Sequence, residues 1–156
     1  MIQIGDHLPE QEFTFITEAG KHSATGAELF GGKKVVIFAV PGAFTPTCSQ
    51  AHLPGFVVLA DQFKDKGVEL YCLSVNDAFV MRAWQQAQNA DAITMLADGA
   101  GHFTRALGLD KDTGDFGGLR AQRFALVAEN GVVTALQVEA PGKFEVSSAE
   151  AMLALV

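Results

Sequence analysis

One corner of the sequence combines a cysteine with residues that could activate it. Residues 41–49 read PGAFTPTCS and directly follow the apolar run KVVIFAV. If Thr45 is the N-cap of a following helix, Cys48 lies in the first turn, beside unpaired backbone N–H groups and the positive end of the helix dipole. Such surroundings favour the thiolate, which is the nucleophilic form of cysteine. The corner predicts a reactive thiol, although a small buried cysteine could also serve only for packing.

Two more side chains could complete this chemistry. The Thr45 hydroxyl shares a helix face with Cys48 and could hydrogen-bond to the sulfur or to a bound oxygen. A cation is expected from Arg123, because a strand antiparallel to residues 34–40 begins at the edge where those residues end; a surface arginine at a strand end is the alternative. Backbone N–H groups, a hydroxyl and a guanidinium could hold a peroxide in line with the sulfur, leaving a sulfenic acid.

The elements that position these residues are predicted from their apolar patterns. Continuous β-branched runs indicate buried strands, and apolar residues at helical spacing indicate amphipathic helices. Strands are expected at 34–40, 68–75 and 92–98, and helices at 46–65, 76–89 with Asn76 as its cap, and 101–109.

The last third of the chain departs from this alternation. Residues 108–120 are rich in glycine and predict a loop. Residues 123–139 predict a hairpin around Asn130-Gly131, and Ser147 to Glu150 resembles a capping box before a terminal helix. A parallel core with antiparallel strands added at one side predicts an α/β protein of thioredoxin-like fold, with a central mixed sheet flanked by helices.

Composition limits the classes of protein to consider. A length of 156 residues predicts a single domain over 1–156, and a net charge of −7 disfavours nucleic-acid or membrane surfaces. No apolar run reaches membrane-spanning length, and the first residues lack the features of a signal peptide. Two cysteines without a secretory signal favour the reducing cytoplasm. Four scattered histidines and no CxxC pair predict neither a metal nor a cofactor.

The corner also resembles a known signature. PGAFTPTCS is similar to the peroxiredoxin motif PxxxTxxC, here Pro41, Thr45 and Cys48. The longer PGAFTPTCSxxHLPGF resembles the type II, or peroxiredoxin-five-like, subfamily. Similar stretches continue through LSVNDAFVMRAW, FGGLRAQRFALV and ENGVV, so the resemblance covers nearly the whole chain.

The resemblance implies a thiol peroxidase that reduces hydrogen peroxide and organic hydroperoxides through a Cys48 sulfenic acid. It implies that Thr45 binds a peroxide oxygen and that Arg123 activates both the sulfur and the peroxide. Pro41 would shield the pocket from water, and the N–H groups of Thr47 and Cys48 would complete the donor set.

Four other residues match the family but have ordinary alternatives. Phe44, Phe79 and Phe116 resemble residues of the pocket rim and of the family's dimer contact, so that a homodimer is expected, yet each could simply pack in the core or a loop. His52 matches the subfamily's HLPGF and could tune the site from behind it, or be a structural histidine with satisfied hydrogen bonds.

The region in which some relatives carry a resolving cysteine reads KFEVSSAEAM and has none. Cys72 is the remaining candidate, but it falls in a predicted buried strand and is interpreted as a core residue. We therefore expect a one-cysteine mechanism recycled by glutathione and glutaredoxin, with thioredoxin as the alternative reductant. A disulfide exchanger would require a CxxC pair, and a binding module would leave Cys48 inert.

Overall fold

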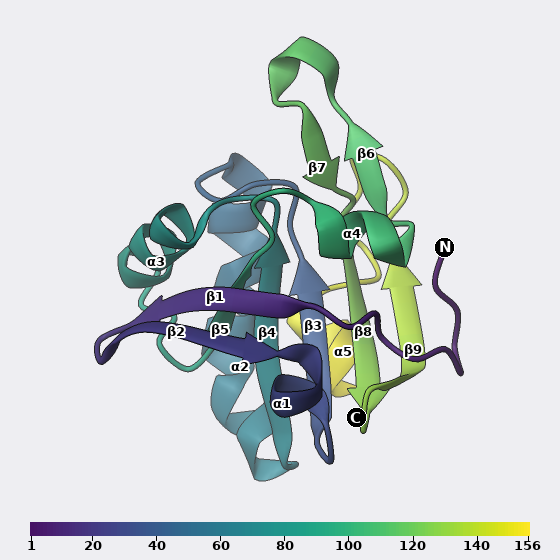
Figure 1. The fold of residues 1–156 in the computed structure, drawn as a ribbon. Coiled ribbons are helices and arrows are strands. Elements are labelled where there is room, and N and C mark those ends of the chain that lie inside the picture. The colour runs from purple at the N-terminus through teal and green to yellow at the C-terminus, as the bar shows by residue number, and fades with distance from the viewer.

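The computed structural model describes residues 1–156 and arranges them around a mixed seven-stranded sheet (Figure 1). The strand order is β2-β1-β5-β4-β3-β8-β9, with a parallel centre and antiparallel strands at both sides. The central and C-terminal strands are β3 (Lys34–Ala39), β4 (Val68–Ser74), β5 (Thr94–Ala97), β8 (Phe124–Glu129) and β9 (Val132–Val138). The three predicted core strands, the C-terminal hairpin and the mixed sheet are therefore confirmed.

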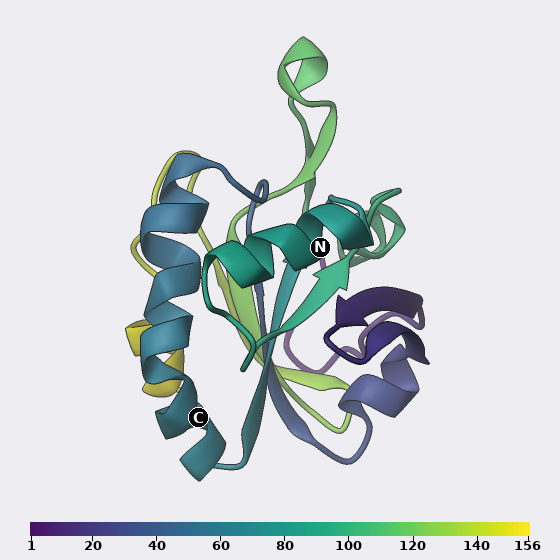
Figure 2. The same cartoon turned by 90° about the vertical axis from the view of Figure 1, so that its left-hand side faces the viewer.

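Helices cover both faces of this sheet, as Figure 2 shows. One face packs against α2 (Leu53–Asp65), α3 (Ala78–Ala87) and α5 (Ala149–Leu153), and the other against α1 (Gly26–Phe30) and α4 (His102–Leu107). Side chains of β3 alternate between the two layers: Val36 and Phe38 belong to the first, Val35 and Ile37 to the second. The two-sided burial explains why this strand is continuously apolar.

The pairing of β3 with β8 is the feature that positions the site. The strands run antiparallel with Ala39 opposite Phe124. Residue 123 therefore lies beside the end of β3, where the chain enters the PGAFTPTCS corner. This register is the topological relationship that the sequence predicted for Arg123.

The N-terminal elements were not predicted. β1 (Glu12–Thr17) and β2 (Gly20–Thr25) form a hairpin that extends the sheet beyond β5, and α1 follows at once. β2 has no buried residue, and α1 has only five residues. Neither presents a long enough apolar pattern to be recognised; a capping box between Thr25 and Glu28 fixes the start of α1.

The prediction of a loop over 108–120 is wrong. This segment contains β6 (Asp110–Asp112), a short 3-10 turn at Gly114–Phe116, and the start of β7 (Leu119–Ala121). The two strands pair only with each other and rise from the body of the molecule (Figure 1). Strands of only three residues are too short to show a recognisable apolar alternation, so no sequence pattern indicated them.

Two predicted helix caps are also wrong. Asp77, not Asn76, caps α3 by accepting from the Val80 N–H at 2.9 Å. Asn76 instead accepts from the Ala43 N–H at 3.0 Å and so ties the corner to the end of β4. Ser148 alone caps α5; the capping box of Ser147 and Glu150 does not form, because Ser147 is bound elsewhere.

None of the helices combines the length and the apolar character that a membrane-spanning segment requires. The structure contains no group of three or more His, Cys, Asp or Glu side chains arranged to hold a metal ion. The expected cytoplasmic location stays a prediction.

Candidate functional site

Cys48 lies in the first turn of the helix that follows β3, and its side chain is fully buried. The Thr45 carbonyl accepts from the Ser49 N–H at 3.0 Å, so the helix begins at Thr45 as predicted. Residues Cys48–His52 then form a π-helical turn before α2 continues. The N–H groups of Thr47 and Cys48 have no acceptor within the protein, which leaves two donors free at the sulfur's end of the helix.

Arg123 lies directly beside the sulfur. Its Nη2 donates to Cys48 Sγ at 3.1 Å, across 75 residues of sequence. Arg120, three residues earlier, contacts the backbone of the corner instead of the sulfur: the Nη1 of Arg120 donates to the Pro41 carbonyl at 2.9 Å. The structure therefore brings together Cys48, Arg123 and the corner, and a fixed cation faces the sulfur.

Thr45 is part of the corner, but its hydroxyl does not cap the helix. The hydroxyl donates to the Gly42 carbonyl at 2.7 Å, so no side-chain cap hydrogen bond is made. A hydroxyl whose proton is committed in this way retains its oxygen lone pairs as acceptors. Thr45 is therefore set up to accept a hydrogen bond from a bound molecule rather than to donate one.

His52 is buried behind Arg123 and links it to the C-terminal segment. Its Nε2 lies 2.9 Å from the Ser147 carbonyl, which accepts only, so Nε2 carries the proton. Nδ1 then accepts from Arg123 Nη1 at 2.8 Å. His52 is thus a structural histidine with satisfied hydrogen bonds and also a direct contact of the arginine, which joins the two interpretations that the sequence left open.

This histidine is held neutral. Burial, and secondly the charge of Arg123, lower the pKa of His52 from 6.5 to about 3, against the opposing effects of the Ser147 carbonyl and Glu139. The ring centroids of Phe144 and Phe38 lie 4.9 and 5.2 Å from the imidazole centroid, and these rings supply the apolar surroundings. A neutral imidazole can hold the guanidinium without cancelling or repelling its charge.

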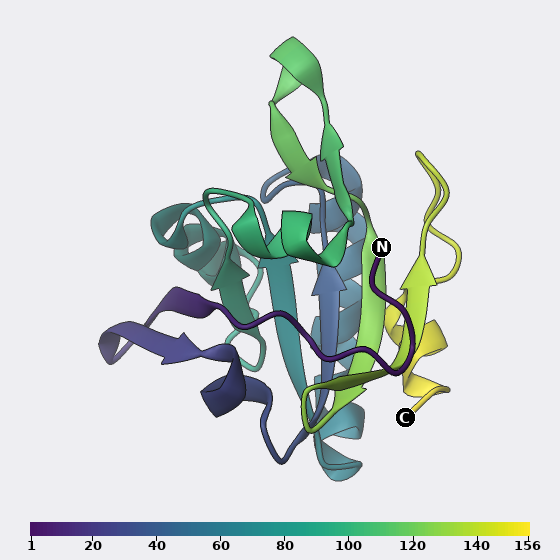
Figure 3. The same ribbon diagram turned by 45° about the vertical axis from the view of Figure 1, so that its right-hand side comes forward.

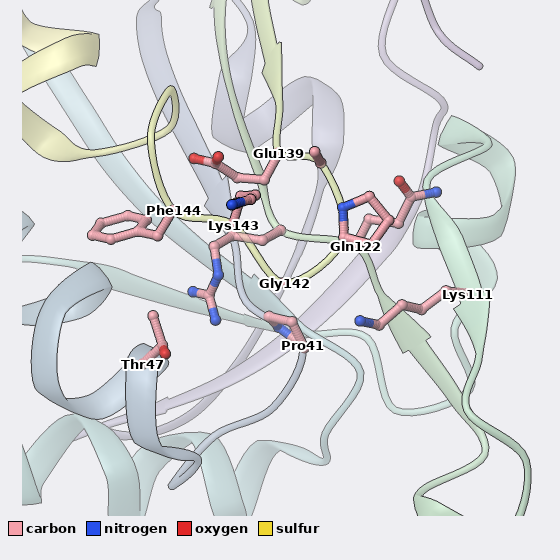
Figure 4. Close-up of a pocket in the computed structure, with 11 residues that line it drawn as sticks. Pro41, Thr47, Lys111, Gln122, Glu139, Gly142, Lys143 and Phe144 are labelled. Carbon is pink, nitrogen blue, oxygen red and sulfur yellow. The ribbon is translucent and has the colours of Figure 1, made fainter.

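A pocket of about 500 Å³ opens beside this group (Figure 4). Three of its lining residues were predicted for the site: Pro41, Thr47 and Arg123. Cys48, whose side chain is fully buried, and Thr45 do not line it. The other lining residues were missed by sequence reasoning: Lys111, Gln122, Glu139, Ala140, Pro141, Gly142, Lys143 and Phe144.

Most of the missed residues lie in one segment after β9, at the same end of the sheet as the β6–β7 hairpin (Figure 3). Phe144 covers Arg123, whose guanidinium carbon is 5.8 Å from the ring centroid. The sequence of this segment, APGKF, offered only turn residues as a signal. Its relation to the corner depends on how the chain returns after β9, which local patterns do not specify.

The phenylalanines predicted at the rim do not line the pocket. Phe44, Phe79 and Phe116 are exposed by 57%, 74% and 85%. None of them is a core residue, so packing in the core is excluded for all three. The expected homodimer contact through them stays a prediction.

Cys72 lies in the core, as predicted from its strand. It is fully buried on β4, opposite Phe38 and Met95. Burial, reinforced by the nearby Cys48, raises the pKa of the Cys72 thiol well above its usual range. Both cysteines are free thiols.

Comparisons with known proteins give one consistent result. The Redoxin family model matches residues 3–153. Peroxiredoxin-2E-2, chloroplastic, of Oryza sativa subsp. japonica is 49% identical over 97% of this chain and 71% of its own length. Peroxiredoxin-2B of Arabidopsis thaliana is 46% identical over 97% of this chain and 96% of its own.

Solved structures agree with this result. Reduced Prx3 from Vibrio vulnificus in complex with H2O2 is 61% identical, with a TM-score of 0.95 and 99% of each chain covered. Peroxiredoxin 5 from Alvinella pompejana is 32% identical, with a TM-score of 0.86 over 99% of this chain and 97% of that one. The likeness therefore extends over nearly the whole fold.

The buried neutral His52 predicts a specific loss of stability in mild acid. The unfolded chain protonates this residue below its ordinary pKa of 6.5, whereas the folded protein does so only near 3. Stability is therefore complete above pH 6.5 and falls as the pH decreases, by about 2 kcal/mol between pH 7 and 5. Urea unfolding at the two pH values measures this loss.

His52→Gln is the control, because it removes the titrating ring. The pKa values of Glu28 and Glu139 are also lowered, from 4.5, so their contributions are lost only in more acidic solution. An equal loss of stability in wild type and His52→Gln would show that His52 is not the source.

Proposed function

Because this chain belongs to the type II peroxiredoxins, which are thiol peroxidases, we propose that Cys48 is its peroxidatic cysteine and that Arg123 activates it. The family match also confirms the predicted resemblance and the thioredoxin-like fold. The observation that carries the proposal is the hydrogen bond of 3.1 Å from Arg123 Nη2 to Cys48 Sγ. A guanidinium cannot lose its proton at neutral pH, so it stabilises the thiolate rather than the thiol.

The reaction follows from this arrangement. The Cys48 thiolate attacks one oxygen of the peroxide, the O–O bond breaks, and the other oxygen leaves with its electron pair and takes a proton to become water or an alcohol. The sulfur is oxidised to a sulfenic acid and the peroxide is reduced. The N–H groups of Thr47 and Cys48 and the Arg123 guanidinium stabilise the developing charge, while Thr45 accepts a hydrogen bond from the peroxide.

Pro41 is proposed to keep water from the sulfur. It lines the pocket beside Thr47, and Arg120 holds its carbonyl in place. Excluding water strengthens the electrostatic interactions on which the reaction depends.

We infer a one-cysteine mechanism, in which an external thiol reduces the sulfenic acid. Cys72 is buried in β4, and its raised pKa disfavours the thiolate that would have to attack. An external thiol attacks the sulfenic sulfur, and a mixed disulfide forms as water leaves. Because the Cys48 side chain is fully buried, the residues that cover it must move before the external thiol can reach the sulfur.

Glutathione, regenerated through glutaredoxin, is the reductant that the pocket favours. Lys111 and Lys143 line it, and neither forms an ion pair, whereas Lys33, Lys34 and Arg82 do. Figure 4 shows the Lys111 side chain extending toward Pro41, whereas the Glu139 carboxylate points away from Pro41 and Lys111. Unpaired cations in a protein of net charge −7 suit the two carboxylates of glutathione. Thioredoxin is the alternative reductant.

Arg123→Met is expected to slow the reaction with hydrogen peroxide by roughly two to three orders of magnitude, because a preorganised charge at the reacting atom is lost. Stopped-flow fluorescence can measure the rate, since the single tryptophan, Trp84, donates to Ser49 Oγ at 3.0 Å next to Cys48. Arg105→Met, an exposed arginine on α4, is the matched control. A wild-type rate in a folded Arg123→Met protein would remove Arg123 from the site.

Lys111→Gln and Lys143→Gln are each expected to raise the KM for glutathione by roughly threefold, and both together by about tenfold, as for partly exposed ion pairs. NADPH oxidation coupled through glutaredoxin measures this. Turnover with the neutral dithiothreitol should not change, and Lys21→Gln, an exposed lysine on β2, controls for net charge. Turnover supported only by thioredoxin would overturn the assignment of glutathione.

Cys72→Ser is expected to retain turnover within about twofold, because the thiol plays no part in resolving the sulfenic acid. Cys48→Ser should abolish it. The intact mass of wild type after one equivalent of peroxide should show one added oxygen. Loss of two hydrogens, together with an inactive but folded Cys72→Ser protein, would show that Cys72 is the resolving cysteine.

A further inference from the structure

We propose that Glu139 is a positioning residue for Arg123: by clasping residues 145–147, it orients His52, and His52 in turn fixes the guanidinium at Cys48. The inference rests on the proposed roles of Cys48 and Arg123, but it concerns residues that do not touch the sulfur. No sequence motif singled out Glu139, which directly follows β9.

The clasp consists of four hydrogen bonds to one buried carboxylate. Oε1 accepts from the Glu145 N–H at 2.8 Å, and Oε2 accepts from the N–H groups of Val146 and Ser147 at 2.8 Å each. The Ser147 hydroxyl adds a fourth bond at 2.7 Å. Glu139 is only 6% exposed and forms no ion pair, so these donors alone satisfy its charge.

Both ends of this clasp lie against the site. The Glu139 N–H donates to the Arg123 carbonyl at 3.0 Å, so Glu139 is anchored to the backbone of the arginine itself, directly before β8. The five residues between Glu139 and Glu145 all line the pocket. Closing the segment at residues 145–147 therefore fixes the pocket wall as well as Ser147.

A chain of hydrogen bonds connects Ser147 to the Cys48 sulfur through His52 and Arg123, and in each bond the donor and the acceptor are determined. The buried Ser147 carbonyl accepts from His52 Nε2, which leaves Nδ1 as an acceptor for Arg123 Nη1. The other terminal guanidinium nitrogen, Nη2, is then directed at Cys48 Sγ. If the Ser147 carbonyl moved, the imidazole could place its proton on Nδ1 and would no longer accept from Arg123.

A carboxylate is the side chain that this position requires. Its two oxygens accept from four donors, whereas the amide of glutamine offers one oxygen and presents two N–H groups to the donors of residues 145–147. Glu139→Gln therefore opens the clasp with almost no change in side-chain volume. The same substitution at Glu145, whose side chain is exposed, is a matched control within the segment.

Glu139→Gln is expected to slow the reaction of Cys48 with hydrogen peroxide roughly 10- to 100-fold, as misplacement of a positioned group by about 1 Å does. Glu145→Gln should react like wild type. Ring ¹⁵N chemical shifts of His52 give a readout that does not depend on peroxide: wild type should show the Nε2–H tautomer, and Glu139→Gln a mixture of tautomers. A wild-type rate and a single tautomer in folded Glu139→Gln would overturn the proposal.

A double-mutant cycle tests whether Glu139 acts through Arg123. In an Arg123→Met background, Glu139→Gln should lower the rate no further; an equal loss in both backgrounds would contradict positioning. Should Glu139→Gln fail to fold, Ser147→Ala removes one bond of the clasp and enters the same cycle. If wild type itself did not react with peroxide, the proposed function would fail, whereas a reactive wild type with an inert Arg123→Met leaves only the role of Glu139 in question.

Discussion

The contact between Arg123 and Cys48 is the constraint on which the rest of the site depends. A guanidinium 3.1 Å from a fully buried sulfur stabilises negative charge only if it cannot turn away. Its other neighbours prevent this: His52 accepts from Nη1, and Phe144 lies over its face. Three separate parts of the chain therefore hold the guanidinium: the β3–β8 strand pair, the helix that carries His52, and the segment that carries Phe144. The site exists only in the folded protein.

The sheet supplies the first of these parts through its register. β3 and β8 pair so that residue 123 comes level with the end of β3, where the helix carrying Cys48 begins. A slip of one residue along this pair would move Arg123 to the opposite face of the sheet. The alternating burial of β3 between two apolar layers makes such a slip costly, and the hydrophobic core thereby sets the position of the reactive group.

The parts of the site that depend on the sheet could be predicted from the sequence, whereas those that depend on the segment after β9 could not. Arg123 and the corner could be placed because apolar strands and the Asn130-Gly131 turn have strong local signals, and strand order followed from them. The clasp of Glu139 could not be predicted, since a single glutamate beyond a strand is ordinary. Its partners are three backbone N–H groups and one serine hydroxyl, six to eight residues later. The β6–β7 hairpin and β2 were missed because polar or very short strands lack a recognisable apolar alternation. β1 does alternate, with Phe13 and Phe15 separated by Thr14, and this signal was missed.

The choice of His52 as the partner of Arg123 has a physical reason. A carboxylate in its place would form an ion pair with the guanidinium and compete with the Cys48 thiolate for its charge. A protonated histidine would repel it. Burial lowers the pKa of His52 to about 3 and so leaves a neutral acceptor, which orients Arg123 at no cost to its charge. The nearby carboxylate, Glu139, is turned inward onto residues 145–147, and the positive charge remains directed at the sulfur and the pocket.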